Sequence, residues 1–184
     1  MKTVQMWRDF NYPKELIACA KTVVNIVGKE NYEILCTNPK IPKELGNVRW
    51  KNFDEEYAKA LADQKNIDWW KTYCTTNYFK SDLIRLWYAT RFPDLFYIDA
   101  DIQLLYLPNL SRENVPYFLQ KDFCMFNVNG NIKWFEELID AVTQNPSMPM
   151  IIFHYLTGIN CSDNRLNFPN DCCKRTFFGK VWIR

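Results

Sequence analysis

The stretch LFYIDADIQLL, residues 95–105, places two carboxylates one residue apart at the end of an apolar run. The unbroken hydrophobic character of residues 95–98 predicts a strand buried on both faces, as in a sheet covered by helices on both sides. Residues i and i+2 of a strand point to the same face, so Asp99 and Asp101 should project together. Because two neighbouring carboxylates repel each other, we expect a cation or polar ligand between them.

Length and composition limit the possible classes of protein. The 184 residues, 48% of them hydrophobic, predict one catalytic domain over residues 1–184. The net charge of +2 comes from scattered Lys, Arg, Asp and Glu, which argues against nucleic acid as a partner. No apolar run reaches about 18 residues, so we expect no transmembrane segment. A cytoplasmic protein is the expectation, with peripheral membrane contact left open.

Cysteine usage supports the same compartment. The seven cysteines are odd in number and widely spaced, which favours reduced thiols over a disulfide framework. An alternative interpretation stays open, in which a metal is bound by the group His154, Cys161, Cys172 and Cys173.

Periodicity along the chain predicts alternating strands and helices. We expect helices over residues 13–27, from Asp54 onward, over 81–92 with Ser81 as its cap, and over 132–145. We expect strands over residues 3–7, 32–37, 95–99, 103–107 and 123–128. This order predicts an α/β fold with a mostly parallel sheet flanked by helices. Ligands of such sheets bind at the carboxyl ends of the strands, where Asp99 and Asp101 lie.

A second motif precedes the buried strand. Asp82 and Arg85 are spaced i, i+3 and therefore share one face of the predicted helix. The connection Phe92–Pro93–Asp94 is short, so helix and strand should be antiparallel neighbours, with Ser81 and Asp82 near Asp99. The competing interpretation is an exposed ion pair worth about 0.3–0.5 kcal/mol.

Together the two motifs resemble a known family. The segment KSDLIRLWYATRFPDLFYIDADIQLL, residues 80–105, resembles the DXD sugar-binding region of a glycosyltransferase family. That family includes capsular polysaccharide glycosyltransferases, the mannosyltransferase that starts fungal outer chains, and the glucosylating toxins. Its pattern is Ser-Asp-x-x-Arg on a helix followed by an apolar strand ending in Asp-x-Asp, which matches Ser81, Asp82, Arg85, Asp99 and Asp101. Weaker similarity extends to VQMWRD and FNVNGNIKWFEELI.

The resemblance implies a GT-A nucleotide-sugar-binding fold and a function. The expected activity is retaining, metal-dependent transfer of a hexose from a nucleotide-sugar, with UDP-sugar as the expected donor, in polysaccharide biosynthesis. The acceptor would be a glycan, a lipid-linked sugar or a protein. Asp99 and Asp101 would ligate Mn²⁺ or Mg²⁺, which prefer oxygen ligands, and His154 is a candidate third ligand.

The resemblance also implies a set of donor contacts. Asp82 and Arg85 would hold sugar hydroxyls through charge-assisted hydrogen bonds, and Asp99 would contact the ribose or the sugar. The expected catalytic set is Asp82, Arg85, Asp99 and Asp101, and the donor-binding set adds Trp7, Ser81 and Asn127, with Asn129 nearby. Trp7 would stack on the base. For Trp7 and His154, a role in the core is the competing interpretation.

Two other functions stay open. Haloacid-dehalogenase-type phosphatases also place DxD after an apolar strand, but near the N-terminus, whereas here the motif lies about a hundred residues into the chain. The other alternative is a non-catalytic module that binds sugar nucleotides.

Overall fold

The structure of this chain is a computed structural model that describes residues 1–8, 13–37, 41–111, 113–119, 122–144, 166–169 and 171–175. His154 and Cys161 therefore lie outside the described residues. The helices are α1 Lys14–Val27, α2 Phe53–Ala62, α3 Ile67–Tyr73, α4 Asn77–Ala89 and α5 Ile132–Thr143, with short 3₁₀ helices η1 Lys29–Asn31 and η2 Lys43–Leu45. The strands are β1 Lys2–Met6, β2 Tyr32–Cys36, β3 Arg49–Asn52, β4 Leu95–Ile98, β5 Ile102–Leu104, β6 Tyr117–Leu119, β7 Asp122–Asn127, β8 Leu166–Asn167 and β9 Cys173–Arg175.

Among the described residues, seven strands form one sheet and two form a small second sheet. The large sheet has the order β3-β2-β1-β4-β7-β6-β8, and β5 pairs with β9. Strands β1, β2, β3 and β4 run parallel, as do β6 and β8. Strand β7 runs antiparallel to both β4 and β6. The prediction of an α/β fold with a mostly parallel sheet is confirmed.

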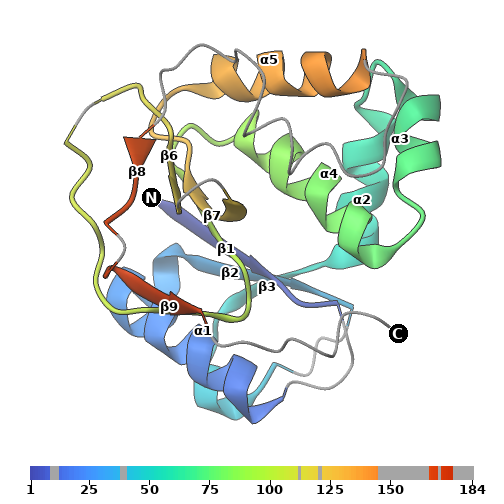
Figure 1. The fold of residues 1–184 in the computed structure, drawn as a ribbon. Coiled ribbons are helices and arrows are strands. Elements are labelled where there is room, and N and C mark those ends of the chain that lie inside the picture. The colour runs from blue at the N-terminus through green and yellow to red at the C-terminus, as the bar shows by residue number, and fades with distance from the viewer. Residues whose placement is uncertain are drawn as a thin grey trace.

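Helices α2, α3, α4 and α5 cover one face of the large sheet (Figure 1). Their buried side chains, such as Trp70 and Phe135, pack with Leu95 and Tyr97 of β4. Phe118 and Phe126 of the antiparallel strands contribute aromatic rings to the same cluster. This is the thicker of the two hydrophobic layers, and α4 lies at its centre.

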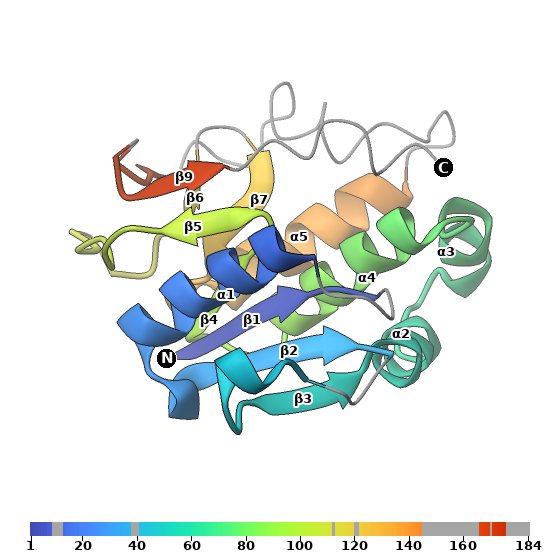
Figure 2. The ribbon, with the colours of Figure 1, turned by 90° about the horizontal axis from the view of Figure 1, so that it is seen from below.

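Helix α1 and the β5–β9 pair cover the opposite face of the sheet (Figure 2). Phe96 and Ile98, which alternate with the β4 residues that face the helical layer, pack here against Val23 and Ile102. The backbone N–H of Leu104 donates to Thr22 Oγ1 at 3.0 Å, which fastens β5 to α1. Strand β4 is thus buried on both faces, as its apolar sequence predicted.

The bounds of two helices agree with the residues that predicted them. Helix α1 starts after Pro13 and stops at Gly28, whose φ of 83° favours glycine. Helix α2 starts at Phe53, and the Asn52 side chain accepts hydrogen bonds from the backbone N–H groups of Asp54 and Glu55.

The predicted start of α4 is wrong. The helix begins at Asn77, four residues before Ser81, and Thr76 is its cap. The Thr76 hydroxyl accepts a hydrogen bond from the backbone N–H of Phe79 at 3.3 Å. Ser81 lies one turn inside the helix, where its Oγ donates to the carbonyl of Tyr78 at 2.6 Å.

This cap gives a stability prediction. Thr76→Ala is expected to lower the free energy of unfolding by about 1 kcal/mol, because it leaves a helix N–H group without its acceptor. Urea denaturation measures the change. The matched control is Thr75→Ala at the preceding exposed residue, which should stay within about 0.5 kcal/mol. Equal effects of the two substitutions would contradict the assignment of the cap.

Three strands of the large sheet were not anticipated. Strand β3 falls in the Pro-rich connection, β6 lies just before β7 in the chain, and β8 is Leu166–Asn167. Within the described part of the chain, no helix is both long enough and apolar enough to cross a lipid bilayer.

Candidate functional site

A cavity of about 240 Å³ lies beyond the ends of β1 and β4, against the first turns of α4. Four of the predicted site residues line it, and they come from a helix, a strand end and a turn. They are Ser81, Arg85, Asp99 and Asp101. The other lining residues are Met6, Arg8, Phe53, Asn77, Tyr78, Tyr97, Ala100 and Arg175. The structure thus brings together two motifs that are separated in the sequence.

The two carboxylates share this cavity because of a turn, not because of a common strand face. Strand β4 ends at Ile98, and β5 begins at Ile102. The N–H of Ile102 donates to the carbonyl of Asp99 at 3.1 Å and closes the turn between the strands. The expectation that Asp99 and Asp101 share one face of a single strand is wrong, but both side chains line the same cavity.

Asp99 is held from several sides. The Tyr97 hydroxyl donates to Asp99 Oδ1 at 2.6 Å, and Arg85 Nη1 lies 3.8 Å from the same oxygen. Gln5 of the adjacent strand β1 donates from Nε2 to the Asp99 carbonyl at 3.0 Å. Tyr97 was not among the predicted site residues, although its position two residues before Asp99 is a sequence signal for this contact.

Burial changes the acidity of this carboxyl group. It raises the pKa of Asp99 from its ordinary value of 3.8 to about 6, and the nearby charge of Asp101 acts in the same direction. Arg85, Tyr97 and Arg175 partly offset this increase. The surroundings therefore destabilise the charged form of this carboxyl group, and a bound cation would stabilise it.

Asp101 faces a residue from the far end of the chain. Arg175 Nε donates to Asp101 Oδ2 at 3.3 Å. Pairing of β5 with β9 sets this contact, because Ile102 lies opposite Arg175 in the register. Nothing local in the sequence indicates this partner, since 74 positions separate the two side chains.

Arg85 is a buried cation between two acids. Its Nη2 lies 3.1 Å from Asp82 Oδ1, its Nη1 faces Asp99, and its guanidinium covers the Tyr97 ring at 4.9 Å. Only 7% of the side chain is exposed, so the interpretation as a surface ion pair is wrong. Ser81 Oγ accepts a further hydrogen bond from Nη2 at 3.3 Å.

Asp82 lies behind Arg85 and not in the cavity wall. One oxygen contacts Arg85, and the other accepts a hydrogen bond from the Tyr73 hydroxyl at 3.0 Å. The i, i+3 spacing correctly placed Asp82 beside Arg85, but the carboxylate turns toward α3. In this geometry Asp82 positions the guanidinium and does not reach the cavity.

Two further predicted residues, Trp7 and Asn127, do not line this cavity. Trp7 follows β1 and is buried, with 7% of its surface exposed, while its neighbours Met6 and Arg8 line the cavity. The prediction for Asn127 is wrong. Strand β7 runs antiparallel to β4, so Asn127 lies beside Phe96, near the end of β4 that is farther from Asp99. Asn127 lines a different cavity there, together with Asn129. The prediction for His154 falls outside the described residues.

The donor atoms in the cavity suit a hard divalent cation. Asp99 and Asp101 offer carboxylate oxygens, and Mg²⁺ or Mn²⁺ binds through one or two carboxylates together with phosphate oxygens. Within the described residues, no group of three or more His, Cys, Asp or Glu side chains is placed to hold a metal. The two carboxylates therefore suit a divalent cation whose remaining ligands are oxygens of a bound phosphate-bearing molecule.

Comparison with known proteins identifies the fold. No protein-family model and no curated protein matches the sequence. Solved structures do match: the PaToxG glycosyltransferase superposes with a TM-score of 0.58 at 16% identity, over 87% of this chain and 66% of that one. The fold is that of a GT-A glycosyltransferase. The apo form of mouse xyloside xylosyltransferase 1 gives a TM-score of 0.53 at 10% identity, over 90% of this chain and 83% of the mouse chain.

Proposed function

We propose that this chain is a metal-dependent, retaining glycosyltransferase that takes a hexose from a UDP-sugar. The observation that carries the proposal is the convergence of Arg85, Asp99 and Asp101 on one cavity at the strand ends of a GT-A fold. Strand ends of open α/β sheets are the usual place for nucleotide ligands. A glycan, a lipid-linked sugar or a protein would accept the hexose.

The cavity residues have distinct roles in this proposal. Asp99 and Asp101 hold Mn²⁺ or Mg²⁺, which supplies positive charge beside the diphosphate leaving group when it is bound. Arg85 reaches the cavity with its guanidinium and binds donor oxygens through charge-assisted hydrogen bonds. Asp82 and Ser81 fix the orientation of that guanidinium, so it need not reorganise during transfer.

Guanidinium groups in the cavity support a diphosphate donor. Three arginines, Arg8, Arg85 and Arg175, line the cavity with the two aspartates. Arg8 and Arg85 also pair with Asp54 and Asp82, so the additional positive charge that a diphosphate needs would come from the divalent cation. Arg175 lies beside Asp101, which places a second guanidinium where phosphate oxygens would come to the metal.

Hydrolysis of a nucleotide-sugar tests the proposal without a known acceptor. Purified protein with Mn²⁺ and each of a panel of UDP-hexoses should release UDP slowly, and chelation with EDTA should stop the release. A coupled nucleoside-diphosphate assay follows the reaction. Stabilisation of the protein by the active donor in a thermal-unfolding assay gives an independent measure of binding.

The same assay separates the alternatives. Release of phosphate from phosphomonoesters, without action on nucleotide-sugars, would replace the proposal with a phosphatase. Thermal stabilisation by donor without any turnover would favour a non-catalytic sugar-nucleotide-binding module. Absence of both binding and hydrolysis across the panel would reject a nucleotide-sugar function for this cavity.

A further inference from the structure

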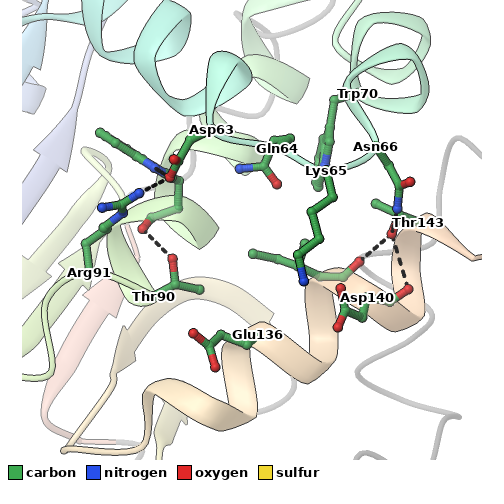
Figure 3. A pocket seen from close by; sticks show the side chains of 12 residues that line it. Asp63, Gln64, Lys65, Asn66, Trp70, Thr90, Arg91, Glu136, Asp140 and Thr143 are labelled. Carbon is green, nitrogen blue, oxygen red and sulfur yellow. Dashed lines mark hydrogen bonds and ion pairs between the residues drawn. The ribbon is translucent and has the colours of Figure 1, made fainter.

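A second and larger cavity, of about 490 Å³, lies at the other end of α4 (Figure 3). Its walls come from the loop between α2 and α3, the end of α4 and the outer side of α5. It shares no lining residue with the cavity that contains Asp99 and Asp101. Ser81 and Thr90, which line the two cavities, are separated by about 13 Å along α4 and its C-terminal cap. A ligand here would leave the first cavity free.

Side-chain hydrogen bonds hold the three walls of this cavity in place. Asn66 Nδ2 donates to Thr143 Oγ1 at 2.8 Å, which ties the start of α3 to the end of α5. Trp87 Nε1 donates to Asp63 Oδ2 at 2.8 Å, and Arg91 forms an ion pair with the same carboxylate. Walls fixed before a ligand arrives reduce the entropy that binding costs.

Several hydrogen-bonding groups at the cavity remain free to meet a ligand. Within the described residues, the side chains of Lys65, Glu136 and Asp140 have no ion-pair partner. Figure 3 shows Lys65 extending from the loop toward α5, where Glu136 and Asp140 lie across the cavity, while the Gln64 side chain stays beside the loop. Gln64 Nε2 donates to the carbonyl of Ala60, which leaves its side-chain oxygen as an acceptor. Donors and acceptors therefore surround the same space.

Trp70 adds an unmet donor to the cavity wall. Its ring is completely buried, and its Nε1 has no hydrogen-bond partner among the described residues. The indole extends from α3 toward the cavity (Figure 3). A buried N–H group without an acceptor costs about 1–3 kcal/mol. Nε1 has less than 1 Å² of exposed surface, so the cavity wall must shift locally before a ligand oxygen can accept from it and recover part of this cost.

The lining chemistry selects among classes of ligand. Three acids and two bases nearly cancel, and the two unpaired carboxylates of α5 repel phosphate groups. Sugar hydroxyl groups donate to carboxylates and accept from ammonium and indole N–H groups at once, and sugar C–H faces pack on indole rings. The volume lies within the range of about 300–1,000 Å³ usual for ligand clefts.

We propose that this second cavity binds a neutral oligosaccharide, independently of the proposed transferase site. Glu136 and Asp140 accept hydrogen bonds from its hydroxyl groups. Lys65 and Trp70 donate to its oxygens. The site would hold part of a glycan at a distance from the metal cavity.

Titration calorimetry of the full chain with maltohexaose, cellohexaose, chitohexaose and xylohexaose tests this proposal. At least one should bind with a dissociation constant of about 1 mM or lower. The double variant Glu136→Ala/Asp140→Ala should weaken that binding at least about tenfold, because it removes both acceptors from an exposed helix face. The matched control is Glu137→Ala, an exposed acid on the same helix that pairs with Lys133, and it should change binding less than about twofold.

Three results of this titration would overturn the proposal. None of the four hexasaccharides binds, an oligolysine peptide binds in their place, or the double variant binds like the unmodified protein. Asp101→Ala distinguishes this site from the first cavity. Oligosaccharide binding should survive that substitution even if nucleotide-sugar hydrolysis fails, and a loss of both would place the glycan in the metal cavity.

Discussion

Arg85→Met is expected to lower the free energy of unfolding of the metal-free protein by about 3–5 kcal/mol. The guanidinium is 7% exposed and lies between Asp82 and Asp99, at 3.1 and 3.8 Å. Without it, the buried carboxylate of Asp82 and the partly buried carboxylate of Asp99 lose their opposite charge, while the methionine side chain fills much of the same space. The pKa of Asp99 should rise further, because Arg85 now lowers it. Urea denaturation in EDTA at pH 8 measures the loss.

Two further variants show whether charge is the cause. Arg91→Met makes the same change at the end of the same helix, where the guanidinium is 49% exposed, and should cost less than about 1 kcal/mol. Adding Asp82→Asn to Arg85→Met should restore at least about 1 kcal/mol, since the amide removes a buried charge and still accepts from Tyr73. A double variant that is no more stable than Arg85→Met would attribute the loss to packing.

Patterns within single elements predicted most of the fold. The unbroken apolar run of β4 and the helical stripe of α1 are local properties, because each depends on a spacing of at most four residues. The start of α4 was placed too late because Ser81 is a good capping residue, as is Thr76. Both positions satisfy the local rule. The segment Asn77–Lys80 becomes helical, with Phe79 packed against the core beside α3.

Strand direction could not be predicted from the sequence in the same way. A buried strand has the same apolar sequence whether it runs parallel or antiparallel to its neighbour. Strand β7 was therefore expected to end beside Asp99, and Asn127 was assigned to the donor site. Its antiparallel pairing with β4 reverses this and carries Asn127 away from Asp99, while the Cys124 carbonyl of β7 accepts a hydrogen bond from the Asp99 N–H.

The part of the candidate site that α4 and the following strand β4 form could be predicted from the sequence. Arg85, Asp99 and Asp101 converge because a short loop returns the chain from α4 to β4. Arg175 was missed, since its approach to Asp101 depends on β5 pairing with a strand about seventy residues later. The role of Asp82 could not be predicted either. Its side chain is buried and contacts Tyr73 only because α3 packs against α4, and this packing is not visible in the local sequence.

Asp101→Ala is expected to lower Mn²⁺-dependent hydrolysis of a UDP-sugar by about 100-fold under the proposed function. The substitution removes one of the two carboxylates at the cavity wall and leaves Arg175 without its acid, so both metal and charge balance are lost. Stability should change little, since Asp101 lies in a turn and its partner is 42% exposed. Initial rates of UDP release measure the activity, and manganese titration monitored by electron paramagnetic resonance measures the metal.

Two comparisons make this result specific to the site. Asp171→Ala removes an exposed acid near the same strand pair, one that accepts from Tyr106, and should leave hydrolysis within about twofold. Arg175→Gln leaves Asp101 in place without the guanidinium, so manganese should bind more tightly than to the unmodified protein. If Asp101→Ala retained full turnover and manganese affinity, the metal would bind elsewhere. The ion pair between Asp101 and Arg175 would then join the C-terminal strand to the sheet without a part in transfer.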